Sequence, residues 1–241
     1  MTQNAVNIFP GVEPHGQLQQ IISHVWYVTG SVNFKPLVRL PRNMVVIEHQ
    51  GDLTLINCVR LNRSEEKTLD ALGKVTHIMK IGGHDMDDAY YLDRYKATYW
   101  AVASPASDQK IDDSHRLVEG VELPFPNAQL FEFKDTIKPE TAIIIENEGG
   151  LLITCDSVQH WVPSDLMSFG AKIITRLLGF QKPAQIGPAW KKIQTKPDSS
   201  LLADFNRLAD IPFERIIGGH GGLLTSNGQA TLKTTIKREL G

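Results

Sequence analysis

The segment Arg215-Ile216-Ile217-Gly218-Gly219-His220-Gly221-Gly222 joins a short apolar run to a histidine that has two glycines on each side. Consecutive isoleucines favour a strand, so Arg215–Ile217 is predicted to be one. Glycine adopts backbone conformations that other residues avoid, which predicts a tight turn around the histidine. A histidine in such a turn has little packing of its own. We therefore interpret His220 as a functional side chain at the end of a strand, not as part of the core.

A second polar cluster follows another strand-like run, residues 77–81. The sequence Gly82-Gly83-His84-Asp85-Met86-Asp87-Asp88 holds four potential metal ligands within five residues. The two glycines allow the backbone to turn so that these side chains converge. The alternative is that the aspartates cap a helix that runs on through Tyr91 and Tyr95, with His84 in a loop. Both interpretations stay open.

The third cluster is Leu151-Leu152-Ile153-Thr154-Cys155-Asp156, an apolar strand that ends in an acid. A carboxylate at the end of a buried strand is well placed to bridge or orient a metal ion. A turn or helix-capping role for Asp156 is the alternative.

Together the three clusters resemble the metallo-β-lactamase superfamily. In that family an H-x-H-x-D-H loop follows an early strand, a later strand ends in G-D, and a late strand ends in G-H-G. Residues 151–156 match the G-D strand except that Cys155 replaces the glycine, and residues 216–221 match the G-H-G element. The matching stretches run from Val25 to Leu240. The resemblance implies an α/β fold with four layers in the order αββα.

The same resemblance shows which metal ligands of the family are missing. With His84 at the first histidine of the loop, Met86 stands at the second, Asp88 at the aspartate and Ala89 at the last histidine. A shift of one residue would instead bring Asp85, Asp87 and Asp88 to ligand positions. The turn that carries the middle histidine corresponds to residues 136–142, which contain none, and Asn57 stands where the first hairpin usually ends in an acid.

The resemblance therefore implies at most one metal ion. Asp88, Asp156 and His220 would hold a single divalent cation such as zinc, iron or manganese, with His84 as a further ligand or as an acid–base group. His84 and Asp88 are the candidates for catalysis. A protein of the same fold that binds no metal is the alternative.

The pattern of short strands supports the layered fold. Apolar runs flank His49-Gln50-Gly51-Asp52 and Asn147-Glu148-Gly149-Gly150, which predicts a hairpin in each half of the chain. Helices are predicted from Ser64, from Ser164, from Asp198 or Ser199, and from Asn227. We expect one domain over residues 1–241. The predicted strands are residues 25–28, 44–48, 53–56, 77–81, 98–103, 129–133, 142–146, 151–154 and 215–217.

Composition limits the partners. The chain has 241 residues and a formal net charge of −2, which argues against broad electrostatic binding of nucleic acid or an anionic membrane, although it leaves a local basic patch open. No stretch is long and apolar enough for a membrane span, and the first residues do not resemble a secretory signal, so a cytoplasmic location is expected. The two cysteines, Cys58 and Cys155, are expected to be buried free thiols.

Three functions remain after this reading of the sequence. The first is a metal-dependent hydrolase with one metal ion, acting on a small molecule that the sequence does not identify. The second is a metal-free protein that binds a ligand or partner in the same cleft. The third is a redox protein with a carboxylate-rich iron site, which we favour least.

Overall fold

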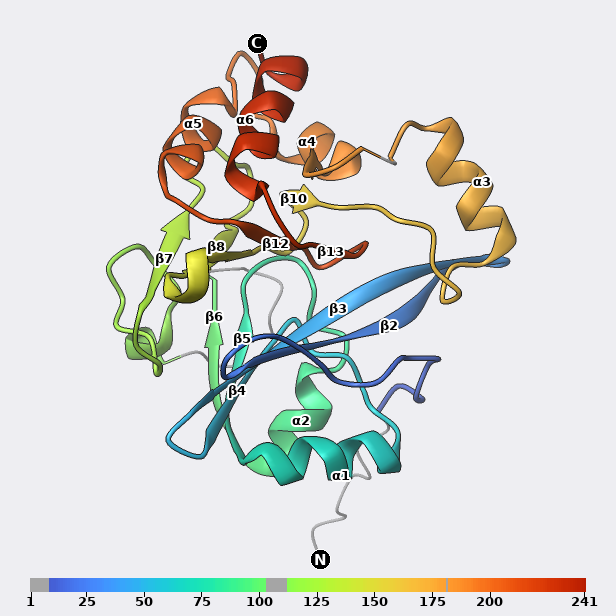
Figure 1. Ribbon diagram of the computed structural model, residues 1–241, viewed down its shortest axis with the longest axis vertical. Helices are drawn as coiled ribbons and strands as arrows, with labels where there is room; N and C mark the ends of the chain where they lie inside the picture. Colours follow the sequence, from blue (N-terminus) through green and yellow to red (C-terminus); the bar gives the residue numbers. More distant parts are fainter. Residues whose placement is uncertain (1–8, 103–111, 181) are drawn as a thin grey trace, which may run out of the picture.

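A computed structural model of the protein describes residues 9–102, 112–180 and 182–241. Its centre is formed by two facing sheets (Figure 1). The first has six strands in chain order, antiparallel from β1 to β4 and parallel from β4 to β6. Its strands are β1 (Gln19–Ile22), β2 (Val25–Lys35), β3 (Val38–His49), β4 (Asp52–Ile56), β5 (Lys74–Lys80) and β6 (Thr98–Ala101).

The second sheet has the order β13-β12-β9-β8-β7, in which only the β9–β12 pair is parallel. A small antiparallel pair, β10–β11, lies outside both sheets. The bounds are β7 (Ala128–Glu132), β8 (Thr141–Ile145), β9 (Leu151–Ile153), β10 (Val158–Gln159), β11 (Gln185–Ile186), β12 (Arg215–Ile217) and β13 (Leu223–Leu224).

Helices cover the outer faces of the two sheets, which gives the four-layer αββα order that the sequence predicts (Figure 1). Helices α1 and α2 cover the first sheet, α4, α5 and α6 cover the second, and α3 lies beside the end of the β2–β3 hairpin. The helices are α1 (Arg63–Leu72), α2 (Asp88–Tyr95), α3 (Phe169–Leu177), α4 (Pro188–Gln194), α5 (Leu202–Asp210) and α6 (Gly228–Glu239), with 3₁₀ turns η1 (Asp113–His115) and η2 (Asn147–Gly149).

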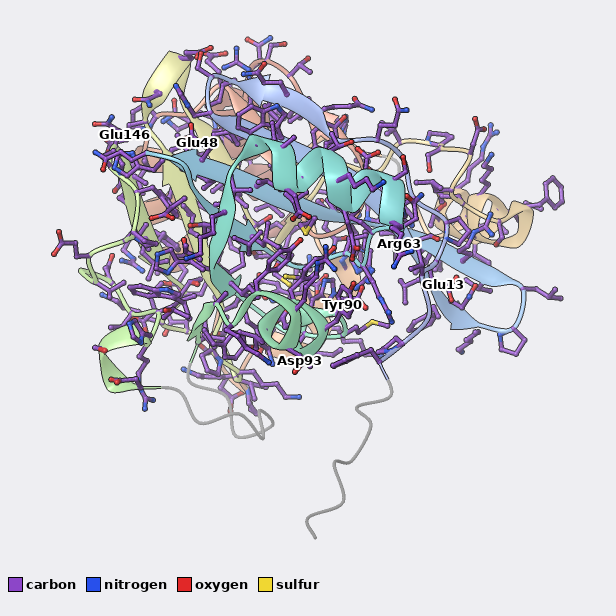
Figure 2. The ribbon with its side chains drawn as sticks, turned by 90° about the horizontal axis from the view of Figure 1, so that it is seen from below. Glu13, Glu48, Arg63, Tyr90, Asp93 and Glu146 are labelled. Carbon is purple, nitrogen blue, oxygen red and sulfur yellow. The ribbon has the colours of Figure 1, made fainter. Side chains whose placement is uncertain are left out.

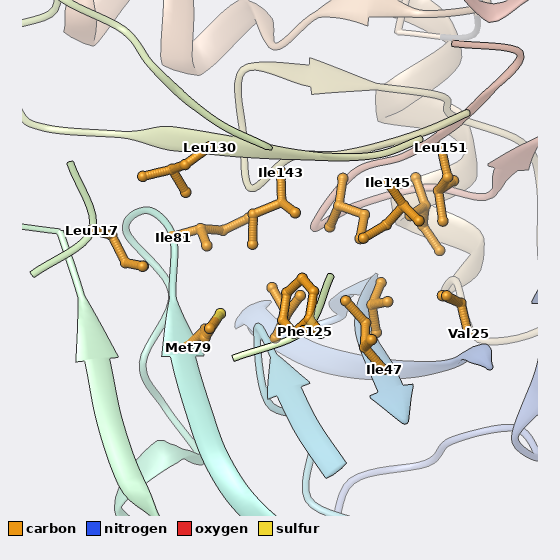
Figure 3. Packing of buried hydrophobic residues seen from close by; sticks show 14 of the residues in the cluster. Val25, Ile47, Met79, Ile81, Leu117, Phe125, Leu130, Ile143, Ile145 and Leu151 are labelled. Atoms are coloured by element: carbon orange, nitrogen blue, oxygen red, sulfur yellow. The ribbon is translucent and has the colours of Figure 1, made fainter. Parts of the chain in front are cut away.

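Strand β8 shows how the sequence produces these layers. Successive side chains of a strand point to opposite faces, so a strand buried on both sides is apolar throughout. Ile143 and Ile145 pack between the sheets, whereas Ala142 and Ile144 pack against the helices on the outer side. Figure 3 shows Ile143 and Ile145 facing Ile47 and other residues of the first sheet.

Several local predictions are confirmed. Strands β3 and β4 form one predicted hairpin, β8 and β9 form the other, and Cys58 and Cys155 are buried free thiols. Three helix starts differ, one of them that of α5, which begins at Leu202 and not at Asp198 or Ser199. Asn62, not Ser64, caps α1 by accepting hydrogen bonds from two backbone N–H groups, and α3 begins at Phe169 behind its cap Ser168, later than predicted. No helix in the described part of the chain is long and apolar enough to cross a membrane.

Candidate metal centre

The ends of three strands bring His84, Asp156 and His220 together. Strands β9 and β12 run parallel with Ile153 opposite Ile217, so the turns that follow them leave the second sheet at the same edge. His84 comes from the turn after β5 of the first sheet. The sequence-based prediction that these three turns meet is confirmed.

The three side chains are close enough to share one ion. One ligand atom from each of His84, Asp156 and His220 lies within 4.8 Å of the other two. The Nε2 atom of His84 is 3.2 Å from Asp156 Oδ2, and that of His220 is 3.5 Å from Asp156 Oδ1. The two imidazole rings meet edge to face at 4.7 Å between centroids. The three side chains are 15–25% exposed, so solvent and small molecules can reach them.

His220 is held in place on both sides. Its Nδ1 atom lies 2.7 Å from the carbonyl oxygen of Pro41, which fixes the tautomer with a proton on Nδ1 and leaves Nε2 facing Asp156. The ring of Trp161 stacks on it at 5.7 Å. The predicted need for glycine in this turn is confirmed at Gly221, where φ is +89° and a Cβ atom would collide with the carbonyl oxygen of His160.

Asp156 is held by a chain of hydrogen bonds. Gln159 Nε2 donates to Asp156 Oδ1 at 3.1 Å, and Trp161 Nε1 donates to Gln159 Oε1 at 2.7 Å. Trp161 therefore touches one ligand directly and orients another through Gln159.

Glu140 holds the backbone of the turn that carries Asp156. This fully buried carboxylate accepts hydrogen bonds from the backbone N–H groups of Asp156 at 3.2 Å and Ser157 at 2.8 Å, and from Trp190 Nε1 at 2.6 Å. Burial, and then the charge of Asp156, raises the pKa of Glu140 to about 7. Glu140 lies in the turn where the sequence comparison found no histidine. The lone acid in that turn was the only sequence signal for its role.

The charges of the cluster are coupled. Burial alone would lower the pKa of His84, but Cys155 and the Asp156 carboxylate beside it raise this pKa well above its usual value. Burial would likewise raise the pKa of Asp156, but His84 and His220 hold it below its usual value. Burial lowers the pKa of His220. Without a cation, His84 and Asp156 therefore form an ion pair while His220 stays neutral at pH 7.

The structure separates Asp88 from this cluster. Asp88 is the first residue of α2, and its buried carboxylate accepts a hydrogen bond from Tyr99 Oη at 3.1 Å and lies against Cys58. A helix does begin in this segment, as the alternative interpretation predicted, but the N-cap Asp87 makes no side-chain capping hydrogen bond, and the Asp88 carboxylate lies in the interface between α2 and the first sheet. The neighbouring aspartates also have partners. Asp87 pairs with Arg42, and Asp85 pairs with Lys80 at 2.7 Å.

Replacing Asp88 by asparagine tests this placement through the pH dependence of stability. Burial raises the pKa of Asp88 to about 6, so its ionisation is disfavoured in the folded state. Its stabilising contribution is complete below its ordinary pKa and falls as the pH rises towards 6. We expect Asp88→Asn to raise the unfolding free energy by about 3 kcal/mol at pH 7.5 and to leave it nearly unchanged at pH 4. Urea unfolding at both pH values measures this, and equal effects at the two would contradict it.

Two other polar residues near the cluster take structural positions. Asn57, at the end of the first hairpin, donates from Nδ2 to the carbonyl oxygen of Thr154 at 3.2 Å and so ties the first sheet to the strand that precedes Asp156. His160 pairs through its backbone with Gly221, and burial lowers its pKa.

Solved structures share this architecture at low sequence identity. VMB-1, solved at pH 5.5, is 12% identical, with 94% of this chain and 97% of that chain covered and a TM-score of 0.64. FIM-1 from Pseudomonas aeruginosa, solved in a mono-zinc form, is 13% identical over 95% and 97% of the two chains, with a TM-score of 0.58. A metallo-β-lactamase from Pontibacter korlensis is 12% identical over 92% and 99%, with a TM-score of 0.60. No family model and no curated protein sequence matches the chain.

The fold and the place of the three clusters within it thus define the class. The chain has the metallo-β-lactamase fold, as its sequence motifs predict. It carries a His-Asp-His group that can hold a metal ion.

Proposed function

We propose that the protein is a hydrolase that depends on one divalent metal ion held by His84, Asp156 and His220. Asp88, which the sequence placed among the ligands, is left out because its carboxylate belongs to the α2 interface. The observation that carries the proposal is the convergence of two imidazole nitrogens and one carboxylate within 4.8 Å. Three protein ligands with an open position are typical of catalytic zinc sites, whereas structural sites use four.

The residues fit a metal ion in chemistry and in support. Imidazole suits zinc and iron, and a carboxylate adds the charge that any divalent cation prefers. Two of the three ligands also have the hydrogen-bonded partners typical of metal sites, since His220 bonds to the Pro41 carbonyl and Asp156 to Gln159. A cation bound here would supply Lewis acidity and activate water at neutral pH.

The surrounding side chains define what the protein itself contributes. Trp161 covers one face of His220 and keeps water from that side, and Gln159 fixes the orientation of Asp156. His84 comes from the opposite sheet, and it contacts the Asp156 carboxylate, the Cys155 thiol and the ring of His220. If His84 does not bind the metal, it takes the other role that the sequence predicts, that of an acid–base group beside the ion.

One observation favours the metal-free alternative. His84 and Asp156 already pair at 3.2 Å, and the raised pKa of His84 gives the cluster an internal charge balance. In that case the three residues would bind a ligand through hydrogen bonds, or would only stabilise the turns.

A thermal melt with and without chelator separates the two functions. A metal-dependent hydrolase should bind one equivalent of zinc, manganese or iron, its melting temperature should fall in chelator, and it should cleave an ester, lactone or phosphodiester only after metal is restored. A melting temperature that changes with neither chelator nor added metal would favour the metal-free alternative.

A further inference from the structure

Helix α3 presents its large apolar side chains to solvent. Phe169 and Leu177 are each 80% exposed, and Leu178, just after the helix, is 62% exposed. The residues that α3 buries are the small Ala171 and Thr175. A surface helix normally places its apolar stripe towards the core, so this reversed arrangement requires another surface to cover it.

The tip of the β2–β3 hairpin extends the same surface. Phe34 is 65% exposed and Leu37 is 91% exposed. The hairpin is joined to the start of α3, because Ser168 Oγ donates to the carbonyl oxygen of Leu37 at 2.7 Å. Figure 1 shows α3 and this hairpin projecting together from one side of the molecule. We call this surface the α3 patch; its exposed apolar residues are Phe34, Leu37, Phe169, Ile173, Ile174, Leu177 and Leu178.

The segments that form the α3 patch carry basic and no acidic residues, and the acids nearest to them are Glu13, which accepts hydrogen bonds from Asn33 of the hairpin, and Asp165, which precedes α3. Residues 25–47 and 166–197 contain no aspartate or glutamate, although the whole chain has 27 of them. Next to the apolar side chains lie the exposed Lys35, Arg176 and Lys182 and the half-buried Lys172. The net charge of −2, from which no membrane partner was expected, is an average that hides this basic region.

We propose that the α3 patch docks on an anionic lipid surface. Apolar side chains flanked by lysine and arginine are typical of helices that lie in the interface of a bilayer, where the apolar groups enter the acyl boundary and the cations meet lipid phosphates. A second copy of the chain fits less well, because like charges on the two patches would face each other.

Docking there would place the metal centre next to the lipid. Behind α3, the buried Trp161, Met167 and Ala171 pack together with Val38 and Leu40 of β3. Trp161 is the residue that stacks on His220. One apolar cluster therefore connects the docking surface to the metal centre. The docking proposal does not depend on whether that centre is catalytic.

Co-sedimentation with vesicles tests the proposal. We expect the full chain to bind vesicles of phosphatidylcholine mixed with phosphatidylglycerol and not vesicles of phosphatidylcholine alone. The double variant Lys172→Glu/Arg176→Glu should bind the anionic vesicles more than about tenfold more weakly, given about 1 kcal/mol for each basic residue at an anionic surface. Phe169→Ser/Leu177→Ser should weaken binding by a similar factor.

Matched controls lie on other faces. Lys67→Glu/Lys233→Glu reverses two exposed lysines on α1 and α6, and Ile137→Ser removes an apolar side chain that is 53% exposed outside the patch. These variants should bind like the wild type. Equal binding to both vesicle types, or patch variants that bind normally, would overturn the proposal. The proposal would also be overturned if the chain binds no vesicles and forms a dimer in sedimentation equilibrium that the patch variants abolish.

Discussion

We expect Asp156→Asn to weaken the binding of a divalent cation by more than about 100-fold and to abolish any metal-dependent hydrolysis. Loss of a hydrogen-bond partner of a metal ligand already costs 10–100-fold, and this change removes the only charged ligand of the three. Asp156 is also the residue that both imidazoles face, at 3.2 and 3.5 Å. Titration calorimetry of the metal-stripped protein with zinc measures the effect.

Asp88→Asn is the matched control for this experiment. It makes the same chemical change at a buried aspartate outside the cluster, whose partners are Tyr99 and Cys58. The control should bind zinc like the wild type. Normal zinc binding by Asp156→Asn would show that Asp156 is not a ligand, and loss of zinc binding in Asp88→Asn would show that Asp88, which the sequence placed among the ligands, belongs to the site.

The difference between Asp156 and Asp88 also shows which parts of the site could be predicted from the sequence. The G-D and G-H-G elements each end a strand, and strand pairing alone brings Asp156 and His220 to one edge. Their positions could therefore be predicted from local patterns. Asp88 follows a strand as well, but the same residues also suit the start of a helix. Which role they take depends on how α2 packs against Tyr99 and Cys58, and the local sequence does not contain that information.

For a related reason, the role of Glu140 could not be predicted from the sequence. Its three donors lie 16, 17 and 50 residues away in the chain. No spacing rule links them, and only the folded second sheet and α4 bring them together. The layers, by contrast, follow from residue patterns within single strands, such as the apolar run 142–145 of β8.

The second large effect is expected at Glu140. Glu140→Ala leaves the backbone N–H groups of Asp156 and Ser157 and the indole N–H of Trp190 without their acceptor. Each unsatisfied buried donor costs about 1–3 kcal/mol, so we expect the unfolding free energy to fall by about 3 kcal/mol or more. Because the Asp156 turn loses its support, the protein that remains folded should bind zinc about 10–100-fold more weakly. Urea unfolding and calorimetry at low temperature measure the two effects separately.

Two further variants distinguish positioning of Asp156 from stability alone. Glu65, on α1, is another buried glutamate that accepts a backbone hydrogen bond, from Leu18 at 2.7 Å. Glu65→Ala should cost stability without changing the affinity for zinc. Glu140→Gln keeps an acceptor for the two backbone groups, so it should retain most of the zinc affinity. The raised pKa of Glu140 predicts that the wild type becomes less stable as the pH rises from 4.5 to about 7. The stability of Glu140→Gln should not fall over this range, because glutamine does not ionise. If Glu140→Ala lowers stability yet binds zinc as tightly as Glu65→Ala, Glu140 supports the fold and does not position the metal ligand.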